Sequence, residues 1–150
     1  MKIIKAEIND AKELTELAII AKTFWGYSNV QIEKWHSELT ITTDYIKKNT
    51  VFKLCNLKEI VGFYAYYLKE NIAEIDFLFV SPKYIRNGFG KLLLQHCLCH
   101  IKNTKSIKIT LDSDPNAEEF YKKQGFETVK FKKSSIKNRF LPVMEMKLQN

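Results

Sequence analysis

The sequence predicts an α/β protein of the α+β kind, with a mixed central sheet of about six to seven strands flanked by about four helices. Two short polar connections, at residues 57–59 and 69–71, separate three apolar stretches and make them antiparallel neighbours. A glycine-bearing turn at residues 85–91 then leads through an apolar helix to a further strand, and such a crossover joins parallel or near-parallel strands. Both kinds of connection in one chain require a mixed sheet.

The first third of the chain is expected to hold one strand followed by helices. A short strand at residues 2–6 precedes a helix that opens at Asp10, whose carboxylate can cap the first turn. After a break at residues 25–28, a second helical stretch covers residues 30–39, and Thr43 is expected to cap a short turn that ends at residue 48.

The rest of the chain is expected to alternate strands with two longer helices. Gly125 is placed to stop the second of these, because glycine readily takes the left-handed conformation that follows many helices. No stretch reads as a linker between domains, so residues 1–150 are predicted to form one domain. The predicted strands cover residues 51–56, 60–68, 72–80, 106–111, 127–132 and 143–148, and the helices cover residues 88–102 and 115–124.

Composition fits a small globular domain. The chain has 150 residues, of which 45% are hydrophobic and 27% are charged, which is ordinary for a protein with one core. The formal net charge is +7, but the 24 basic residues are dispersed along the chain, so no nucleic-acid partner is expected. A basic surface suits a polyanionic small molecule equally well.

A cytoplasmic location is expected from the N-terminus, the hydropathy and the cysteines. The first residues include acids and lack the long apolar region of a signal peptide, and no apolar run approaches the roughly 20 residues of a membrane span. No membrane partner is therefore expected. Three cysteines are too few for a disulfide framework, which agrees with a reducing compartment.

The segment LFVSPKYIRNGFGKLLL, residues 78–94, joins the end of an apolar strand to a helix through a turn that contains Gly88 and Gly90. The glycines leave no side chains between the backbone and an incoming ligand. The first turn of a helix also directs N–H groups and the positive end of its dipole at an anion. This turn therefore predicts a phosphate site, although a G-x-G sequence alone also closes many structural turns.

A second segment strengthens the interpretation of the glycine turn. It is DPNAEEFYKKQGF, residues 114–126, and it follows the predicted strand at residues 106–111. Together the two segments resemble the GNAT superfamily of acetyl-CoA-dependent N-acetyltransferases. The stretches FWGYS, DSDPNAEEFY and SSIKNRFLPVMEMKL resemble a bacterial branch of that superfamily with uncharacterised acceptors. The resemblance implies the GNAT acyl-CoA N-acyltransferase fold and acetyl-CoA as the acetyl donor.

The resemblance also assigns the residues that bind coenzyme A. In this superfamily the strands beside the crossover splay apart and the pantetheine arm pairs with the earlier strand, which brings in the backbone of Leu78, Phe79 and Val80. The family usually has Gln or Arg three residues before the first glycine, whereas this chain has Ile85 there, with Arg86 one place later. The residues assigned to the pyrophosphate loop are Ile85, Arg86, Asn87, Gly88, Phe89, Gly90 and Lys91.

Tyr121 and Asn116 lie in the second segment. The implied reaction is attack by a neutral amine on a thioester, after which the leaving thiolate takes a proton. Tyr121 matches the family tyrosine that donates this proton, and an ordinary phenol, with a pKa of about 10, is protonated at neutral pH. The alternative is a ring that only packs at a helix end. Asn116 is assigned to the coenzyme A arm, and capping of its helix is the alternative.

Glu74 and Asp76 are the candidates for the general base. They lie two residues apart on the predicted strand 72–80, so their side chains share one face while Ile75, Phe77 and Phe79 share the other. Two neighbouring carboxylates can raise each other's pKa and either accept a proton or bind a cationic amine. Glu74 is the preferred base, with Asp76 supporting it, and a solvated strand face is the alternative.

Trp25 and Tyr27 are candidates for binding the acceptor, together with the nearby Trp35. They lie in a region that covers the acceptor pocket in many members of the superfamily, and aromatic faces attract ammonium groups. Packing in the core is the alternative use of such residues.

A metal site is not expected at the run HCLCH, residues 96–100. On a helix His96 and His100 share a face, whereas Cys97 and Cys99 point elsewhere, so the four side chains cannot converge on one ion.

The sequence thus predicts an acyltransferase (an N-acetyltransferase) that passes acetyl from acetyl-CoA directly to a primary amine of a small molecule or peptide. The alternative is a non-catalytic acyl-CoA-binding or regulatory module that keeps the glycine loop. The sequence does not distinguish among amine acceptors, and homodimers are common in the superfamily.

Overall fold

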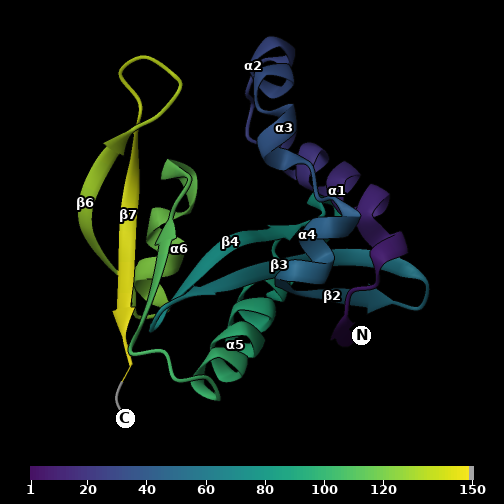
Figure 1. The fold of residues 1–150 in the computed structure, drawn as a ribbon. Helices are drawn as coiled ribbons and strands as arrows, with labels where there is room; N and C mark the ends of the chain where they lie inside the picture. Colours follow the sequence, from purple (N-terminus) through teal and green to yellow (C-terminus); the bar gives the residue numbers. More distant parts are fainter. Residues whose placement is uncertain (149–150) are drawn as a thin grey trace. The chain divides into compact units, whose positions relative to one another are not determined.

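The computed structural model describes residues 1–148 and contains a seven-stranded sheet with the strand order β1-β2-β3-β4-β5-β7-β6 (Figure 1). The strands are β1 (Lys2–Lys5), β2 (Thr50–Asn56), β3 (Glu59–Lys69), β4 (Ile72–Val80), β5 (Lys108–Asp112), β6 (Glu127–Lys133) and β7 (Phe140–Lys147). The helices are α1 (Ala11–Phe24), α2 (Asn29–Lys34), α3 (His36–Leu39), α4 (Thr43–Lys48), α5 (Phe89–Lys102) and α6 (Glu118–Lys123). Short 3₁₀ turns are η1 (Ile8–Asp10), η2 (Pro82–Tyr84) and η3 (Pro115–Ala117).

The sheet is mixed, which confirms the predicted fold class. Strands β4 and β5 are parallel, with Glu74 of β4 opposite Thr110 of β5. The pairs β1–β2, β2–β3, β5–β7 and β6–β7 are antiparallel. Helix α5 makes the predicted crossover between the two parallel strands.

The chain forms two compact units. Unit 1 contains residues 1–66 and 77–97, and unit 2 contains residues 67–76 together with the chain from residue 98 onward. Strands β3 and β4 and helix α5 each begin in one unit and continue in the other.

In unit 1, helix α5 packs closely on strand β3, and Gly62 makes the close approach possible. A Cβ atom at Gly62 would lie 2.7 Å from the carbonyl oxygen of Phe79 and 2.9 Å from Cδ1 of Leu93 on α5. Two residues further along β3, the hydroxyl of buried Tyr64 lies 2.8 Å from Nδ1 of His96 on α5. The even-numbered residues of β3 therefore face α5.

The opposite face of unit 1 holds an aromatic cluster. Phe63 of β3 packs against Phe77 and Phe79 of β4, at centroid distances of 6.0 and 6.1 Å. Tyr45 of α4 meets Phe77 edge-on at 5.6 Å. Helices α4 and α5 thus cover opposite faces of the strands in this unit (Figure 1).

Unit 2 has one apolar and one polar sheet face. On the apolar face Ile109 and Leu111 of β5 are opposite Met146 and Met144 of β7, and all but Met146 are fully or almost fully buried. Helix α6 packs on this side, because Glu118 accepts a hydrogen bond from Thr128, the partner of Met144 on β6, at 2.6 Å. The polar face carries the side chains that alternate with these residues, most of them polar or charged, with buried Val143 opposite Asp112.

Three details near the N-terminus differ from the sequence expectations. The carboxylate of Asp10 does not cap α1; it accepts a hydrogen bond from the Glu7 amide at 2.8 Å and pairs with Lys53 at 2.8 Å. Thr42, not Thr43, caps α4, because Thr42 has the extended backbone that lets its hydroxyl reach the Tyr45 amide at 2.9 Å. The helical stretch at residues 30–39 is two helices, α2 and α3, that meet at buried Trp35.

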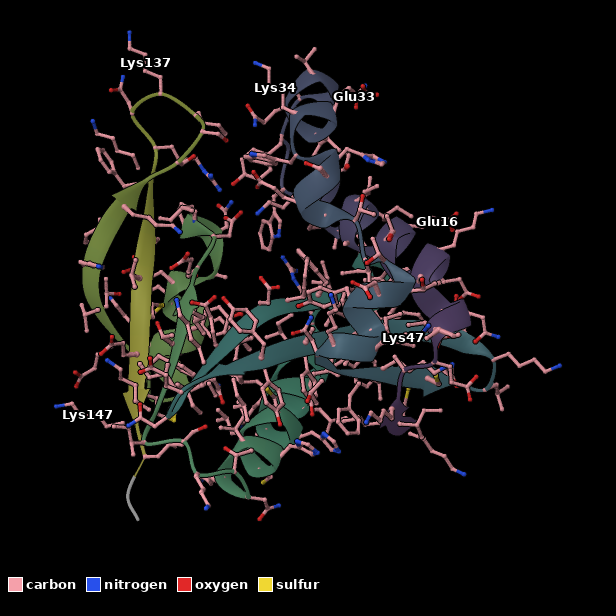
Figure 2. All side chains as sticks on the ribbon, in the orientation of Figure 1. Glu16, Glu33, Lys34, Lys47, Lys137 and Lys147 are labelled. Carbon is pink, nitrogen blue, oxygen red and sulfur yellow. The ribbon has the colours of Figure 1, made fainter. Side chains whose placement is uncertain are left out.

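Charged side chains project from separate elements, as the dispersed sequence positions predict. Figure 2 shows Glu16 on α1, Glu33 and Lys34 on α2, and Lys137 on the β6–β7 connection. Within residues 1–148, no helix combines the length and hydropathy needed to cross a lipid bilayer.

Candidate active site

The glycine loop of unit 1 has the backbone that an anion site needs. Gly88 has φ +77°, in the left-handed region, and an added Cβ there would meet no atom within 4 Å. Helix α5 begins at the next residue and continues for 14 residues, so its first N–H groups lack intrahelical acceptors. Arg86 also has a positive φ of 71°, which is unusual for a residue with a side chain. A turn of this kind, with alternating backbone conformations, directs successive N–H groups toward one side.

Tyr84 organises the start of the loop. Its carbonyl oxygen accepts a hydrogen bond from Nδ2 of Asn87 at 3.0 Å, and its ring lies 6.1 Å from that of Phe89. Its hydroxyl donates to Glu59 of β3, which also pairs with Lys83 at 2.5 Å. This anchoring was not predicted from the sequence, because Glu59 and Tyr84 are 25 residues apart in the chain.

The three strand residues assigned to the pantetheine arm differ in the direction of their backbone groups. The amide of Ser81 donates to Val61 of β3 at 2.8 Å, and the Phe79 carbonyl lies against Gly62 of the same strand. Because successive residues of a strand direct their N–H and C=O groups to opposite edges, those of Leu78 and Val80 face away from β3. The backbone groups of Phe79 face β3, so pairing with the pantetheine arm suits Leu78 and Val80 better.

The remaining loop side chains fall into two groups. Ile85 is half-buried and its amide donates to the Pro82 carbonyl at 3.3 Å. Arg86 and Lys91 are exposed, so both cations can reach a ligand from the surface of the loop. Arg86 can therefore offer a positive charge one place after Ile85.

Glu74 and Asp76 lie on the polar face of unit 2, as the strand period predicts. Ala73, Ile75 and Phe77 are buried, whereas Glu74 is half-buried and Asp76 is exposed. Burial raises the pKa of the Glu74 carboxyl, the charges of Asp112 and Asp76 raise it further, and Lys132 opposes the rise. The expected mutual effect of the two carboxylates is therefore present for Glu74.

Tyr121 is buried on the apolar side of unit 2. Its ring meets Phe126 edge-on at 5.7 Å and Phe120 at 5.1 Å. Helix α6 covers the face opposite to that of Glu74, so Tyr121 and Glu74 belong to different sides of the unit 2 strands. The packing alternative for Tyr121 describes its ring contacts, and its role as an acid stays a prediction.

Asn116 is not the capping residue of its segment, because the preceding aspartate takes that place. Oδ1 of Asp114 accepts hydrogen bonds from the Asn116 amide and from Asn116 Nδ2, both at 2.9 Å. The side chain of Asn116 is thus held by Asp114, and the assigned contact with coenzyme A stays a prediction. Helix α6 itself begins later than expected, after the 3₁₀ turn η3.

Arg139 is a site-proximal residue that the sequence did not reveal. Its Nη2 bonds Oδ2 of Asp114 at 3.0 Å, with both side chains mostly buried, and its Nη1 donates to Oγ of Ser134 at 3.0 Å. Asp114 therefore links the β6–β7 connection to the segment that carries Asn116. No local signal marks a pair that is 25 residues apart, although an arginine between polar loop residues is suited to bridging.

The candidate residues for binding the acceptor differ in exposure and packing. Trp25 is 47% exposed, whereas Tyr27 packs edge-on against buried Trp35 at 4.9 Å. The ammonium of Lys22 lies 5.5 Å from the Tyr27 ring and 5.2 Å from the Trp35 ring. Tyr27 therefore packs against other side chains of the protein, as the core alternative implies, and its ring already has a neighbouring ammonium. Substrate binding by Trp25 and Tyr27 stays a prediction.

The HCLCH run serves packing in unit 1 as far as its residues lie there. His96 contacts Tyr64, its ring lies tilted against that of Phe52 at 4.9 Å, and burial raises the pKa of Cys97. Within residues 1–148, no group of three or more His, Cys, Asp or Glu side chains gathers as a metal site would.

The fold and the glycine loop define an acetyltransferase of the GNAT class, and comparison with known proteins identifies the family. The domain described as "Acetyltransferase (GNAT) domain" matches residues 12–150. The chain belongs to the GNAT acetyltransferase family.

Individual relatives agree with this assignment. The chain is 28% identical over 125 residues to "Uncharacterized N-acetyltransferase YafP" of Escherichia coli (strain K12), a match that covers 81% of this chain and 77% of that protein. Among solved structures, the PaiA N-acetyltransferase from Thermoplasma acidophilum, crystallised with coenzyme A, has a TM-score of 0.80 at 22% identity over 98% of both chains. A GCN5-related N-acetyltransferase from Rhodopseudomonas palustris also has a TM-score of 0.80 at 22% identity, over 98% of this chain and 95% of that one. These structures establish the fold.

Proposed function

We propose that the protein is an N-acetyltransferase that transfers acetyl from acetyl-CoA directly to a primary amine of a small molecule or peptide. The single observation that carries the proposal is the glycine loop: Gly88, with φ +77° and open space around it, comes directly before the start of a 14-residue helix. This backbone suits a pyrophosphate. We also propose one domain over residues 1–150 and a cytoplasmic location.

In this proposal the loop of unit 1 holds the donor. The residues assigned to the pyrophosphate are Ile85 to Lys91, with backbone amides as the main donors and Arg86 and Lys91 adding charge attraction. The backbone of β4 from Leu78 to Val80 pairs with the pantetheine arm, chiefly through Leu78 and Val80. Asn116, held by Asp114, contacts the same arm.

The chemical step is assigned to side chains of unit 2. An ammonium cannot attack a carbonyl, so Glu74 removes the proton from the amine, directly or through water, with Asp76 supporting it. Burial raises the pKa of the Glu74 carboxyl, and the raised pKa favours uptake of a proton by Glu74. Tyr121 protonates the leaving thiolate. Acid and base act on different atoms, sulfur and nitrogen, so their placement on different sides of the strands is compatible with the two roles.

A panel of primary amines tests the proposal. The purified protein is mixed with acetyl-CoA and each amine, coenzyme A release is followed, and products are identified by mass. A product heavier than the amine by one acetyl group supports N-acetylation, and the Tyr121→Phe variant serves as the matched control. Amine acetylation absent throughout a panel of polyamines, amino acids, aminoglycosides and peptides would count against the proposal.

The alternative is a non-catalytic acyl-CoA-binding or regulatory module. One observation favours it: Ile85 occupies the position where the family usually has a polar side chain, and it is half-buried. This alternative predicts that acetyl-CoA binds in calorimetry but that no amine increases coenzyme A release.

A further inference from the structure

The polar face of unit 2 places a second carboxylate beside Glu74. Glu74 is opposite Thr110 on the parallel strand β5, and Asp112 follows two residues later on the same face. Strands lie about 4.8 Å apart and rise about 3.3 Å per residue, so the two backbone positions are roughly 8 Å apart. That separation is shorter than the Debye length of about 10 Å at 0.1 M salt, so the two charges interact.

A lysine from another strand forms an ion pair with Asp112. Nζ of Lys132 on β6 pairs with Oδ2 of Asp112, and the two side chains are 50% and 36% exposed. Lys132 occupies the register position of Leu141 on β7, the strand that lies between β6 and β5. The lysine thus reaches across one strand to offset a negative charge near Glu74.

Two further charges of this face form an ion pair with each other. Lys108 lies two residues before Thr110 on β5 and Glu145 lies opposite Thr110 on β7; the two bond each other at 3.1 Å, so their opposite charges offset each other at Glu74. The charged residues of the face are Glu74 and Asp76 on β4, Lys108 and Asp112 on β5, Glu145 and Lys147 on β7, and Glu127, Lys130 and Lys132 on β6. The strongest effects on the pKa of Glu74 are burial and the charges of Asp112 and Asp76, with Lys132 acting in the opposite direction.

We propose that the Asp112–Lys132 ion pair belongs to the acetyltransferase machinery and, acting through Glu74, sets the lowest pH at which this carboxylate can accept the proton of the acceptor amine. The inference rests on the proposed function. Asp112 and Lys132 are positioning residues, since they act on Glu74 through their charges and not on the substrate. The lysine keeps Glu74 ionised at lower pH than an unpaired Asp112 would allow.

Single substitutions in the pair should shift the acidic limb of kcat/KM in opposite directions. Asp112→Asn removes the repelling charge and leaves Lys132 positive, so the limb moves to lower pH by about half a pH unit or more. Lys132→Met leaves Asp112 unpaired, so the limb moves to higher pH by a similar amount. The double variant lies between the two, and Lys132→Arg, which keeps the positive charge, should rescue the shift that Lys132→Met causes. Lys133→Met, the same change one residue along on the other face, is the matched control and should also keep the parent profile.

A second readout separates this inference from the proposed function. The Glu74 carboxyl, labelled with ¹³C and identified by its loss in Glu74→Gln, is titrated by NMR in the parent and both single variants. Opposite pKa changes that match the limb shifts support the inference. An unmoved Glu74 titration overturns it, and so does a Glu74 titration that moves while the rate profile does not. Absence of amine acetylation in the parent protein, with the NMR changes intact, would reject acetyl transfer and leave the electrostatic coupling established.

Discussion

At the scale of single residues, Gly88 tests the phosphate loop, and unit 1 contains its own control. Gly88 and Gly26 have φ values of +77° and +89°, and neither has an atom within 4 Å of an added Cβ. Gly88→Val and Gly26→Val should therefore each lower the free energy of unfolding by a similar amount, about 1–3 kcal/mol, because a β-branched residue is strained in this region. We expect only Gly88→Val to weaken acetyl-CoA binding, by about tenfold or more, since its side chain occupies the approach to the helix N-terminus.

Isothermal titration calorimetry measures the acetyl-CoA affinity of the two valine variants, and thermal unfolding measures their stability. Equal affinity for acetyl-CoA in the two valine variants would remove the glycine loop from the proposed function. Equal stability with unequal affinity would establish that Gly88 is needed for the ligand as well as for the turn.

The acid and the base should be separable by pH. Tyr121→Phe keeps the ring and removes only the hydroxyl, so turnover should fall by roughly 10²–10⁴-fold with little change in acetyl-CoA affinity. Glu74→Gln should lose most activity at low pH, and the deficit should shrink as pH rises and the amine deprotonates without help. A pH–rate profile measured on the true acceptor checks both effects.

The raised pKa of Glu74 adds a consequence for stability. A carboxyl whose pKa is higher in the fold than in the unfolded chain destabilises the fold as pH rises through the two values. Glu74→Gln should therefore be more stable than the parent at neutral pH and should lose that advantage in acid.

Full activity of both Glu74→Gln and Asp76→Asn would mean that water, and not a carboxylate, takes the proton of the amine.

At the scale of elements, the contacts of β3 with β4 and with α5 depend on the absence of a side chain at Gly62. An alanine at position 62 would bring its Cβ to 2.7 Å from the Phe79 carbonyl oxygen and 3.3 Å from Val80 Cα, and backbone atoms cannot rotate away. Gly62→Ala should lower the free energy of unfolding by about 1–3 kcal/mol or more. Chemical denaturation is the measurement. A Gly62→Ala protein as stable as the parent would mean that β4 shifts without cost.

The sequence predicted the elements whose signals are local. The boundaries of strand β4 followed from the polar connection before it and the glycine turn after it, and the shared face of Glu74 and Asp76 followed from a period of two. The capping alternative for Asn116 is not what the structure shows, because Asp114 caps η3; both residue types are common caps, and only the backbone conformation decides between them. The Asp114–Arg139 and Asp112–Lys132 pairs join residues 20 or more positions apart, and nothing in the local sequence specifies such partners.

At the scale of the whole molecule, the proposed roles are divided between the two units. The residues assigned to the donor's pyrophosphate lie in unit 1, whereas Glu74, Asn116 and Tyr121 lie in unit 2. Strand β4 contributes to both, with its carboxylates in one unit and its last residues in the other. Residues 72–80 therefore contain proposed groups for both donor binding and proton transfer.

The net charge of +7 gives a prediction for the protein as a whole. A basic protein attracts the phosphate groups of acetyl-CoA, and salt screens that attraction as the Debye length falls from about 10 Å at 0.1 M to about 3 Å at 1 M. Acetyl-CoA affinity, measured by calorimetry, should therefore fall by about tenfold over that range, whereas acetyl-pantetheine, which lacks the nucleotide, should bind with little salt dependence. Lys91→Ala should flatten the salt dependence, because Lys91 is exposed in the first turn of α5. Lys137→Ala removes the same charge from the β6–β7 connection (Figure 2) and should leave the slope nearly unchanged. If both lysine variants flatten it equally, the attraction comes from the net charge and not from the loop.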